Sequence, residues 1–257
     1  MAAGKLGYNT TQLTPQDTFE KHIYHRDQFA HYLRWSHVLK NAKHNARTGQ
    51  TILDFGCGSG EILEVFYKNR YVPKKYVGLD IRAKTIAKNA AKFKNLDFAE
   101  FRQVDLCQKE LDLGQTFDII TCFEVMEHIG HKNANNFLDN IAYHCNKDTT
   151  VFFSTPNYDP QVGAAENHML GKDGTEVGEW DHFELQDKLS EYFTIEKKYG
   201  TFASIKDYKA DLVGWRKEAF DELKKYYDRE LLAVIMAPMI PAEHARNCLW
   251  VLKVRED

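Results

Sequence analysis

The chain alternates short apolar runs with amphipathic segments over most of its length, and this alternation predicts its secondary structure. The runs have the length of β-strands, and apolar positions between them recur at helical spacing. Strands are predicted at residues 51–53, 75–79, 99–104, 117–122, 150–154, 194–202 and 248–254, and helices at 61–68, 86–93, 133–145 and 185–193. We therefore expect an α/β fold: a doubly wound, seven-stranded, mostly parallel sheet with helices on both faces.

Two helical segments fall outside this alternation. Near the N-terminus, one helical face collects the apolar residues Phe19, Ile23, Phe29, Leu33 and Val38. Before the last strand, a helical insertion spans about residues 205–240. We predict an N-terminal helical cover at residues 1–47 and an α/β domain at residues 48–257. The cover either packs passively on the domain or forms a lid that supplies contacts to a second ligand, and we favour passive packing.

Composition narrows the class of protein without identifying a partner. The formal net charge of −3 gives no global attraction to polyanions, so nucleic acid is neither indicated nor excluded. The five cysteines contain no Cys-x-x-Cys pair, which favours buried free thiols over disulfides or zinc. No secretion signal or membrane-spanning run is present, so we expect a cytoplasmic protein that uses no membrane. Its oligomeric state is left open.

The most informative segment is a strand that ends in Asp54 and opens into a glycine-rich turn. Gly56, Gly58 and Gly60 allow the backbone to turn sharply and to approach a ligand closely. The next strand ends in Asp80, whose carboxylate can accept two hydrogen bonds from a ribose diol. The two strand ends together predict a site for a nucleotide-like ligand.

The glycine spacing bears on the kind of ligand. It is Gly-x-Gly-x-Gly, and not the Gly-x-Gly-x-x-Gly that places a helix N-terminus on a pyrophosphate. Asp54 would also repel a phosphate, whereas its charge suits an ammonium or a sulfonium. A nicotinamide dehydrogenase is therefore the weaker alternative. The motif at residues 53–60 resembles that of the class I S-adenosylmethionine-dependent methyltransferases, a Rossmann-like family, and the resemblance covers roughly residues 50–255.

This resemblance implies S-adenosylmethionine as cofactor and assigns residues to it. The glycines would wrap the methionine part, Asp80 would bind the ribose, and Ile81 would pack on the adenine. Asp105 with Leu106 would face the exocyclic amine, although Asp105 has a rival role as a loop cap. The predicted cofactor-binding residues are Asp54, Gly56, Cys57, Gly58, Gly60, Asp80, Ile81, Asp105, Leu106 and Phe123.

A Glu-x-x-Glu-His run follows the fourth strand and suggests catalytic residues. If a helix begins there, Glu124, Glu127 and His128 converge, because residues three and four apart share a helical face. With His182, they could hold a divalent metal ion. The run resembles that of the small-RNA 3′-terminal 2′-O-methyltransferases and of the ubiquinone-pathway O-methyltransferases. One alternative is that Glu127 and His128 cap a helix and close the donor pocket, while His182 anchors the next helix through Asp181. Another is that His128 or His182 acts as a general base without a metal. The predicted catalytic residues are Glu124, His128 and His182.

These observations predict a methyltransferase that uses S-adenosylmethionine to modify an oxygen or nitrogen of a small-molecule or nucleotide-type acceptor. One alternative is metal-assisted 2′-O-methylation of RNA. Another is a binding module that keeps the S-adenosylmethionine pocket and has lost catalysis.

Overall fold

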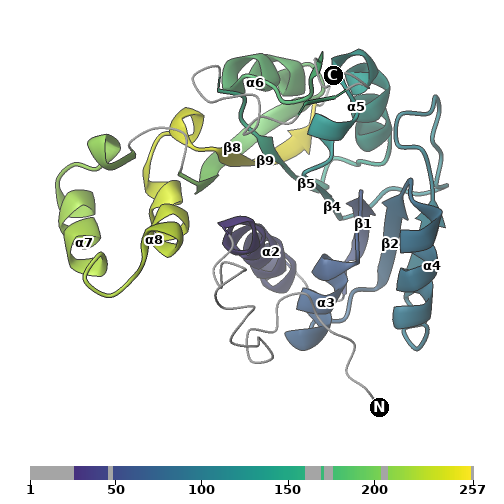
Figure 1. Ribbon diagram of the computed structural model, residues 1–257. Helices are drawn as coiled ribbons and strands as arrows, with labels where there is room; N and C mark the ends of the chain where they lie inside the picture. The colour runs from purple at the N-terminus through teal and green to yellow at the C-terminus, as the bar shows by residue number, and fades with distance from the viewer. Residues whose placement is uncertain (1–25, 46–48, 160–168, 171–175, 204–207, 256–257) are drawn as a thin grey trace.

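The computed structural model describes residues 26–45, 49–159, 169–170, 176–203 and 208–255 (Figure 1). The predicted apolar positions Phe19 and Ile23 lie outside the described residues. So does part of the loop that follows residue 158.

One seven-stranded sheet forms the centre of the molecule, as the alternating pattern predicts. Its strand order is β3-β2-β1-β4-β5-β9-β8. Strands β1 to β5 pair with one another in parallel, whereas β9 is antiparallel to both β5 and β8. The strands are β1 (Thr51–Phe55), β2 (Lys75–Asp80), β3 (Ala99–Gln103), β4 (Ile119–Phe123), β5 (Thr150–Pro156), β8 (Phe193–Phe202) and β9 (Asn247–Val254). Two short strands, β6 (Met169–Leu170) and β7 (Glu176–Val177), form a separate ribbon.

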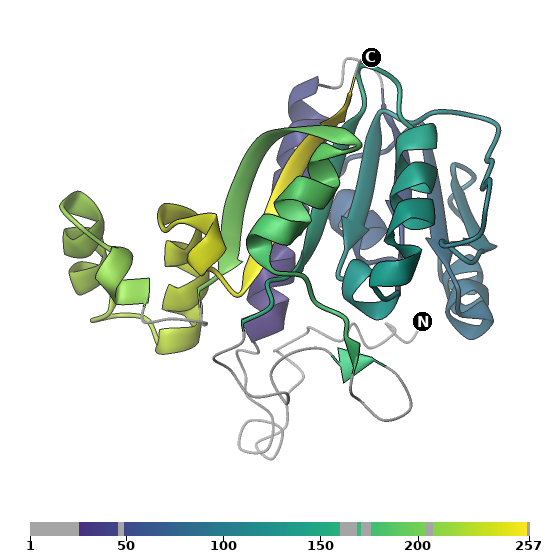
Figure 2. The same ribbon diagram turned by 90° about the horizontal axis from the view of Figure 1, so that it is seen from above.

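Helices cover both faces of the sheet, because strand side chains alternate between two apolar layers. Leu53 and Phe55 of β1 join a core with α5 (Ala134–Tyr143) and α6 (His182–Ser190). Ile52 faces the other way, toward α2 (Arg26–Asn45), α3 (Glu61–Lys68) and the end of α4 (Ala83–Lys92). Figure 2 shows α5 and α6 on one side of the sheet and α2 on the other. The prediction of a doubly wound sheet is thus confirmed.

The strand order reverses between β1 and β4. The carboxyl ends of these two strands diverge into different loops, and such a switch point is where ligands bind in open α/β sheets. Asp54, Asp80 and Glu124 all lie at this edge. Because β9 runs antiparallel, its first residue, Asn247, meets the same edge, where it pairs with Pro156 of β5.

Within the predicted cover, the described residues 26–45 are helical, and this helix packs against several parts of the molecule. Helix α2 contacts α3, α8 (Arg229–Met236) and β8. The described part of the predicted insertion contains a 3₁₀ turn (Tyr208–Asp211), α7 (Trp215–Leu223), α8 and a second 3₁₀ turn (Ala237–Met239). Gly214, with φ of 55°, separates the turn from α7. Helix α7 lies at the far end of the molecule, beyond α8 (Figures 1 and 2).

The cysteines and the helices bear on the chain's redox state and on membrane insertion. All five cysteines are free thiols, and Cys57, Cys122 and Cys248 are buried. Among the helices that the structure describes, none combines the length and apolar character needed to cross a bilayer.

Candidate functional site

The glycine-rich turn joins β1 to α3 at the switch point. Gly56, Gly58 and Gly60 have φ values of 96°, 49° and 76°, in the left-handed region that favours glycine. The N–H groups of Gly56 and Cys57 both donate to the carbonyl of Leu79, at 3.0 and 2.7 Å. These bonds tie the turn to β2. The backbone is therefore held in an open loop beside Asp80.

Asp54 joins the strands on either side of the switch point. Its carboxylate accepts hydrogen bonds from the Tyr76 hydroxyl of β2 at 2.6 Å and from the Thr121 hydroxyl of β4 at 2.9 Å. Burial raises the pKa of Asp54 to about 6, and the two hydrogen bonds counteract part of that rise. Sequence reasoning assigned Asp54 to the ligand and did not foresee this bracing role.

Asp80 lies at the end of β2 with its carboxylate already hydrogen-bonded. The Arg82 backbone N–H and Nε donate to Oδ1 at 2.8 and 3.0 Å, and Arg82 Nη2 donates to Oδ2 at 3.0 Å. Burial opposes ionisation of Asp80, but the hydrogen bonds from Arg82 outweigh it and lower its pKa. The carboxylate is thus held as an anion by a neighbour in the chain.

The predicted adenine contacts flank Asp80. Ile81 is 60% exposed, and Leu106 is buried. Asp105 Oδ1 accepts from the Cys107 N–H at 2.9 Å. The structure therefore shows Asp105 in its rival role as a loop cap.

Asn89 of α4 is a residue of this region that the sequence analysis missed. Its side-chain amide donates to the Gly58 carbonyl at 2.8 Å and is buried. The next residue, Ala90, is exposed. The available signal was a polar residue three positions after Ile86, on the face that packs against the sheet.

Glu124 follows β4 and forms the centre of a second polar cluster. Its backbone has φ of 54°, a strained value for a residue with a side chain. Oε1 accepts from the Ser154 hydroxyl at 2.9 Å and lies 3.3 Å from Arg34 Nη1, while Oε2 accepts from Asn247 Nδ2 at 2.8 Å. The carboxylate therefore joins α2, β4, β5 and β9.

Arg34 is the buried cation of this cluster. It is 1% exposed, and its guanidinium also contacts the Thr201 hydroxyl at 3.5 Å and His31 Nδ1 at 2.8 Å. Burial and the nearby Arg34 charge lower the pKa of His31 to about 3, so the imidazole is neutral. No sequence motif pointed to Arg34, because it lies on an amphipathic helix far from Glu124 in the chain.

Glu127 and His128 lie in a single 3₁₀ turn (Met126–His128), and not in an α-helix. Glu127 is buried, and its Oε2 accepts from the Thr155 hydroxyl at 3.0 Å. Burial and the charge of Glu124 raise the pKa of Glu127 well above its usual value. His128 Nε2 is 3.9 Å from Glu127 Oε1, and its side chain is 54% exposed. The helical face that was to bring these side chains together is absent from the described structure.

His182 begins α6 and is held away from Glu124. Its ring stacks on Trp250, and its two nitrogens lie 3.4 Å from Asn157 Oδ1 and 3.0 Å from Lys198 Nζ. Burial and the Lys198 charge lower the pKa of His182 to about 4. These contacts match the anchoring alternative for this residue.

The predicted metal ligands are therefore not assembled as a set. Within the described ranges, no group of three or more His, Cys, Asp or Glu side chains is arranged to hold a metal ion. Glu124 faces Arg34, and His182 faces Lys198, so cations of the protein occupy the positions beside two of the four predicted ligands. The residues do not fit a divalent ion.

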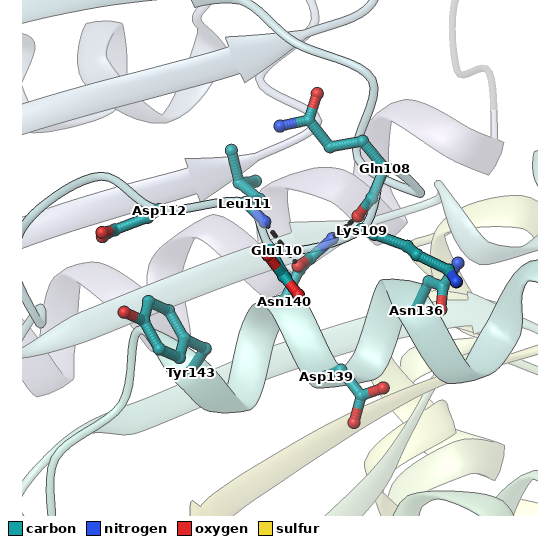
Figure 3. Close-up of a pocket in the computed structure, with 9 residues that line it drawn as sticks. All are labelled: Gln108, Lys109, Glu110, Leu111, Asp112, Asn136, Asp139, Asn140 and Tyr143. Carbon is teal, nitrogen blue, oxygen red and sulfur yellow. Dashed lines mark hydrogen bonds between the residues drawn. The ribbon is translucent and has the colours of Figure 1, made fainter.

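A cavity of about 730 Å³ lies elsewhere, between the β3–β4 loop and α5 (Figure 3). Asn140 organises its wall by accepting from the Leu111 N–H at 3.1 Å and donating to the Leu106 and Gln108 carbonyls. None of the predicted site residues lines this cavity. The strand ends remain the candidate site, because the glycine turn and the Asp80 carboxylate lie together there, next to the point where the strand order reverses.

Two solved structures with a similar fold are named methyltransferases. The O-methyltransferase from a trans-AT PKS multienzyme of Brevibacillus brevis, in complex with S-adenosyl-L-homocysteine, superposes with a TM-score of 0.56 at 18% identity, over 95% of this chain and 80% of that one. The N-methyltransferase NodS of Bradyrhizobium japonicum, in complex with the same compound, gives 0.55 at 12% identity, over 88% of each chain. At these identities the likeness concerns the fold.

Sequence comparison agrees with the fold. The ubiquinone biosynthesis O-methyltransferase of Coxiella burnetii is 31% identical over 112 residues, which are 42% of this chain and 44% of that protein. The chain thus matches less than half the length of this curated relative. Residues 24–234 match the sequence model of a family described as a methyltransferase domain. This chain therefore belongs to the methyltransferase domain family, as its glycine motif indicated.

Proposed function

We propose that this protein transfers the methyl group of S-adenosylmethionine to an oxygen or nitrogen atom of a small-molecule or nucleotide-type acceptor. One observation carries the proposal: the glycine turn, Asp54 and Asp80 meet at the switch point of the sheet. The family match and the named O-methyltransferase relative support it and favour oxygen as the acceptor atom. A cytoplasmic location stays a prediction.

The crevice over β1 and β2 offers complementary groups to each part of the donor. The open turn at residues 56–60 presents backbone groups to the amino-acid tail, with Cys57 packed beneath. Asp80 is placed to accept from the ribose hydroxyls. Ile81 and Leu106 supply apolar surface for the adenine, and Phe123 closes the side next to β4. We assign these residues to donor binding.

S-adenosylmethionine, when bound, supplies an electrophilic methyl group whose carbon–sulfur bond breaks as the new bond forms. The protein has to align the reactants and exclude water. A hydroxyl acceptor must also lose its proton. Glu124 Oε2 accepts a hydrogen bond from Asn247 and, as a carboxylate oxygen, has a second lone pair, so we assign it to receive that proton. Exposed His128 is the second candidate base.

The Glu-x-x-Glu-His run thus serves the acceptor side without a metal in our proposal. His182 is not assigned a catalytic role, because both ring nitrogens face polar neighbours. Metal-assisted methylation of RNA would need Glu124, Glu127, His128 and His182 to surround one ion, and the described residues do not assemble that set.

Calorimetry and turnover test the proposal together. We expect S-adenosylhomocysteine to bind in a single site, and S-adenosylmethionine to be converted to S-adenosylhomocysteine with a panel of hydroxyl and amine acceptors. Turnover should persist in EDTA, and Glu124→Gln should lower it without weakening donor binding. Binding with no turnover across the panel would indicate the inactive module, and binding of a nicotinamide dinucleotide instead would refute the proposal.

A further inference from the structure

Arg82 is hydrogen-bonded to the Asp80 carboxylate, the group that we assign to the ribose of the donor. Three of its N–H groups donate to the two oxygens of Asp80, at 2.8, 3.0 and 3.0 Å. The Gly58 N–H adds a further hydrogen bond to the same carboxylate. The fork of the guanidinium spans both oxygens, as the two hydroxyls of a ribose diol would. A ribose and the Arg82 side chain therefore compete for one acceptor group.

The two partners differ in how firmly they are held. Asp80 is buried, with its side chain 7% exposed, whereas the Arg82 side chain is 65% exposed. Within the described part of the chain, the hydrogen bonds of the guanidinium all go to Asp80. The guanidinium can therefore swing into solvent without losing packing, while the carboxylate stays in place. Exposed ion pairs of this kind are weak, so a ligand can replace this one.

We propose that Arg82 is a further residue of the donor site, a built-in competitor that sets the affinity for the nucleoside. This inference rests on the proposed function, because it takes the ligand to be S-adenosylmethionine or its product. In the free protein, Arg82 keeps the buried Asp80 carboxylate hydrogen-bonded. When the donor binds, its ribose hydroxyls replace the guanidinium. Asp80 then exchanges two hydrogen bonds from Arg82 for two from the ribose.

Only molecules in which the Arg82–Asp80 pair is open can accept the ribose, so the closed pair lowers the apparent affinity for the donor. Removing Arg82 therefore tightens donor binding. The effect is confined to ligands that reach Asp80. An amino acid such as methionine, which fills only the tail of the crevice, does not displace Arg82. High salt weakens the Arg82–Asp80 pair, because the guanidinium is exposed. The difference in donor affinity between the wild type and an Arg82 variant therefore becomes smaller as ionic strength rises.

The test is calorimetry with S-adenosylhomocysteine on wild type, Arg82→Ala and Arg82→Lys. We expect Arg82→Ala to bind about fivefold more tightly at low salt and by a smaller margin at high salt. Arg82→Lys, which makes a one-point contact, is expected to fall between. Arg102→Ala is the matched control, because Arg102 also pairs with an acid two residues earlier, Glu100, but on β3 away from the turn. It should leave the affinity unchanged.

A spectroscopic measurement supplies a second readout. The Nε–H resonance of Arg82, assigned by its absence in Arg82→Ala, should shift when S-adenosylhomocysteine is added and stay in place with methionine. Unchanged or weaker binding of S-adenosylhomocysteine by Arg82→Ala would overturn the inference alone. Failure of the wild type to bind S-adenosylhomocysteine would overturn both this inference and the proposed function.

Discussion

The two parts of the proposed site, a donor side around Asp80 and an acceptor side around Glu124, differ in how far apart in the chain their contacting residues lie. On the donor side, Arg82 contacts Asp80 two residues away, and the Tyr76 and Asn89 contacts span 22 and 31 residues. On the acceptor side, Glu124 and Asn247 are separated by 123 residues, and Arg34 and Thr201 by 167. A site made from one contiguous βαβ unit carries a local motif, whereas one made from distant elements carries none.

The two sides also differ in what fixes their geometry. The donor turn is held by backbone hydrogen bonds and left-handed glycines. The acceptor side is held by buried side-chain contacts around one strained residue, Glu124. We infer that the donor side tolerates changes on the acceptor side, while the acceptor side depends on each of its members. The following changes test this contrast.

The largest effect is expected from Asp80→Ala. The change removes both acceptors for the ribose, and each hydrogen bond to a charged group contributes about 1.5–3 kcal/mol. Affinity for S-adenosylhomocysteine should fall by about a hundredfold or more by calorimetry. Asp105→Ala, in the neighbouring loop cap, should weaken binding far less. Equal losses in the two variants would mean that the ribose is not held by Asp80.

A second effect is expected from Arg34→Met, which leaves Glu124 without its cation. Breaking a buried pair costs about 3–5 kcal/mol, and we expect about 2 kcal/mol because the Glu124 side chain is 20% exposed. The free energy of unfolding, measured with denaturant, should fall by this amount. Lys40→Gln, at an exposed position of the same helix, is the control.

Donor binding sharpens this test. Arg34→Met should keep its affinity for S-adenosylhomocysteine within about twofold. The hydrogen bonds of Arg34 go to His31 and Thr201, and its guanidinium meets the proposed donor site at the Phe123 ring, 5.9 Å away, which the Met side chain can still cover. The double variant Arg34→Met/Glu124→Gln should recover part of the lost stability. A large loss of donor affinity would show that the two sides are coupled.

A third effect concerns pH and Asp54. Its pKa is raised from 3.8 to about 6 in the folded state, so the folded protein binds this proton more tightly than the unfolded chain. The stabilising contribution is fully present below the unfolded value and is lost as pH rises through about 6. The free energy of unfolding should therefore decrease between these values, and Asp54→Asn should remove that decrease.

The same proton opposes ligand binding. An ammonium or sulfonium favours the ionised carboxylate, so affinity should fall by up to about tenfold per pH unit below pH 6 in the wild type. Asp54→Asn should show a flat profile over this range. A flat wild-type profile would assign Asp54 to bracing of the strands alone.

The smallest effect is expected from His182→Phe, which keeps a ring to stack on Trp250 and removes the titration. The pKa of His182 is lowered to about 4, so its contribution to stability is fully present above 6.5 and is lost as pH falls through about 4. The variant should unfold with less dependence on pH in this window. Methyl transfer at neutral pH should be retained, and its loss would restore His182 as a catalytic residue.

Sequence patterns predicted the sheet and the donor turn because both depend on local spacing. The alternation of apolar runs located the strands of the sheet, and the glycine spacing located the turn at the switch point. The same reasoning gave the Glu-x-x-Glu-His run a shared helical face. That expectation was wrong because Glu124 adopts a left-handed backbone and only a 3₁₀ turn follows. Arg34 and Asn247 could not be predicted, since their contact with Glu124 depends on tertiary packing.

The antiparallel strand β9 is the last strand of the sheet to be synthesised, so the contacts that it makes form last. It follows every other strand of the sheet in the chain, and in the described structure β8 pairs only with β9. Until residue 247 has emerged from the ribosome, a nascent chain lacks β9. Strand β5 then has one free edge, β8 has no partner in the sheet, and Glu124 lacks its hydrogen bond from Asn247. The donor crevice can form during translation, whereas the acceptor side is completed only when synthesis of the strand is finished.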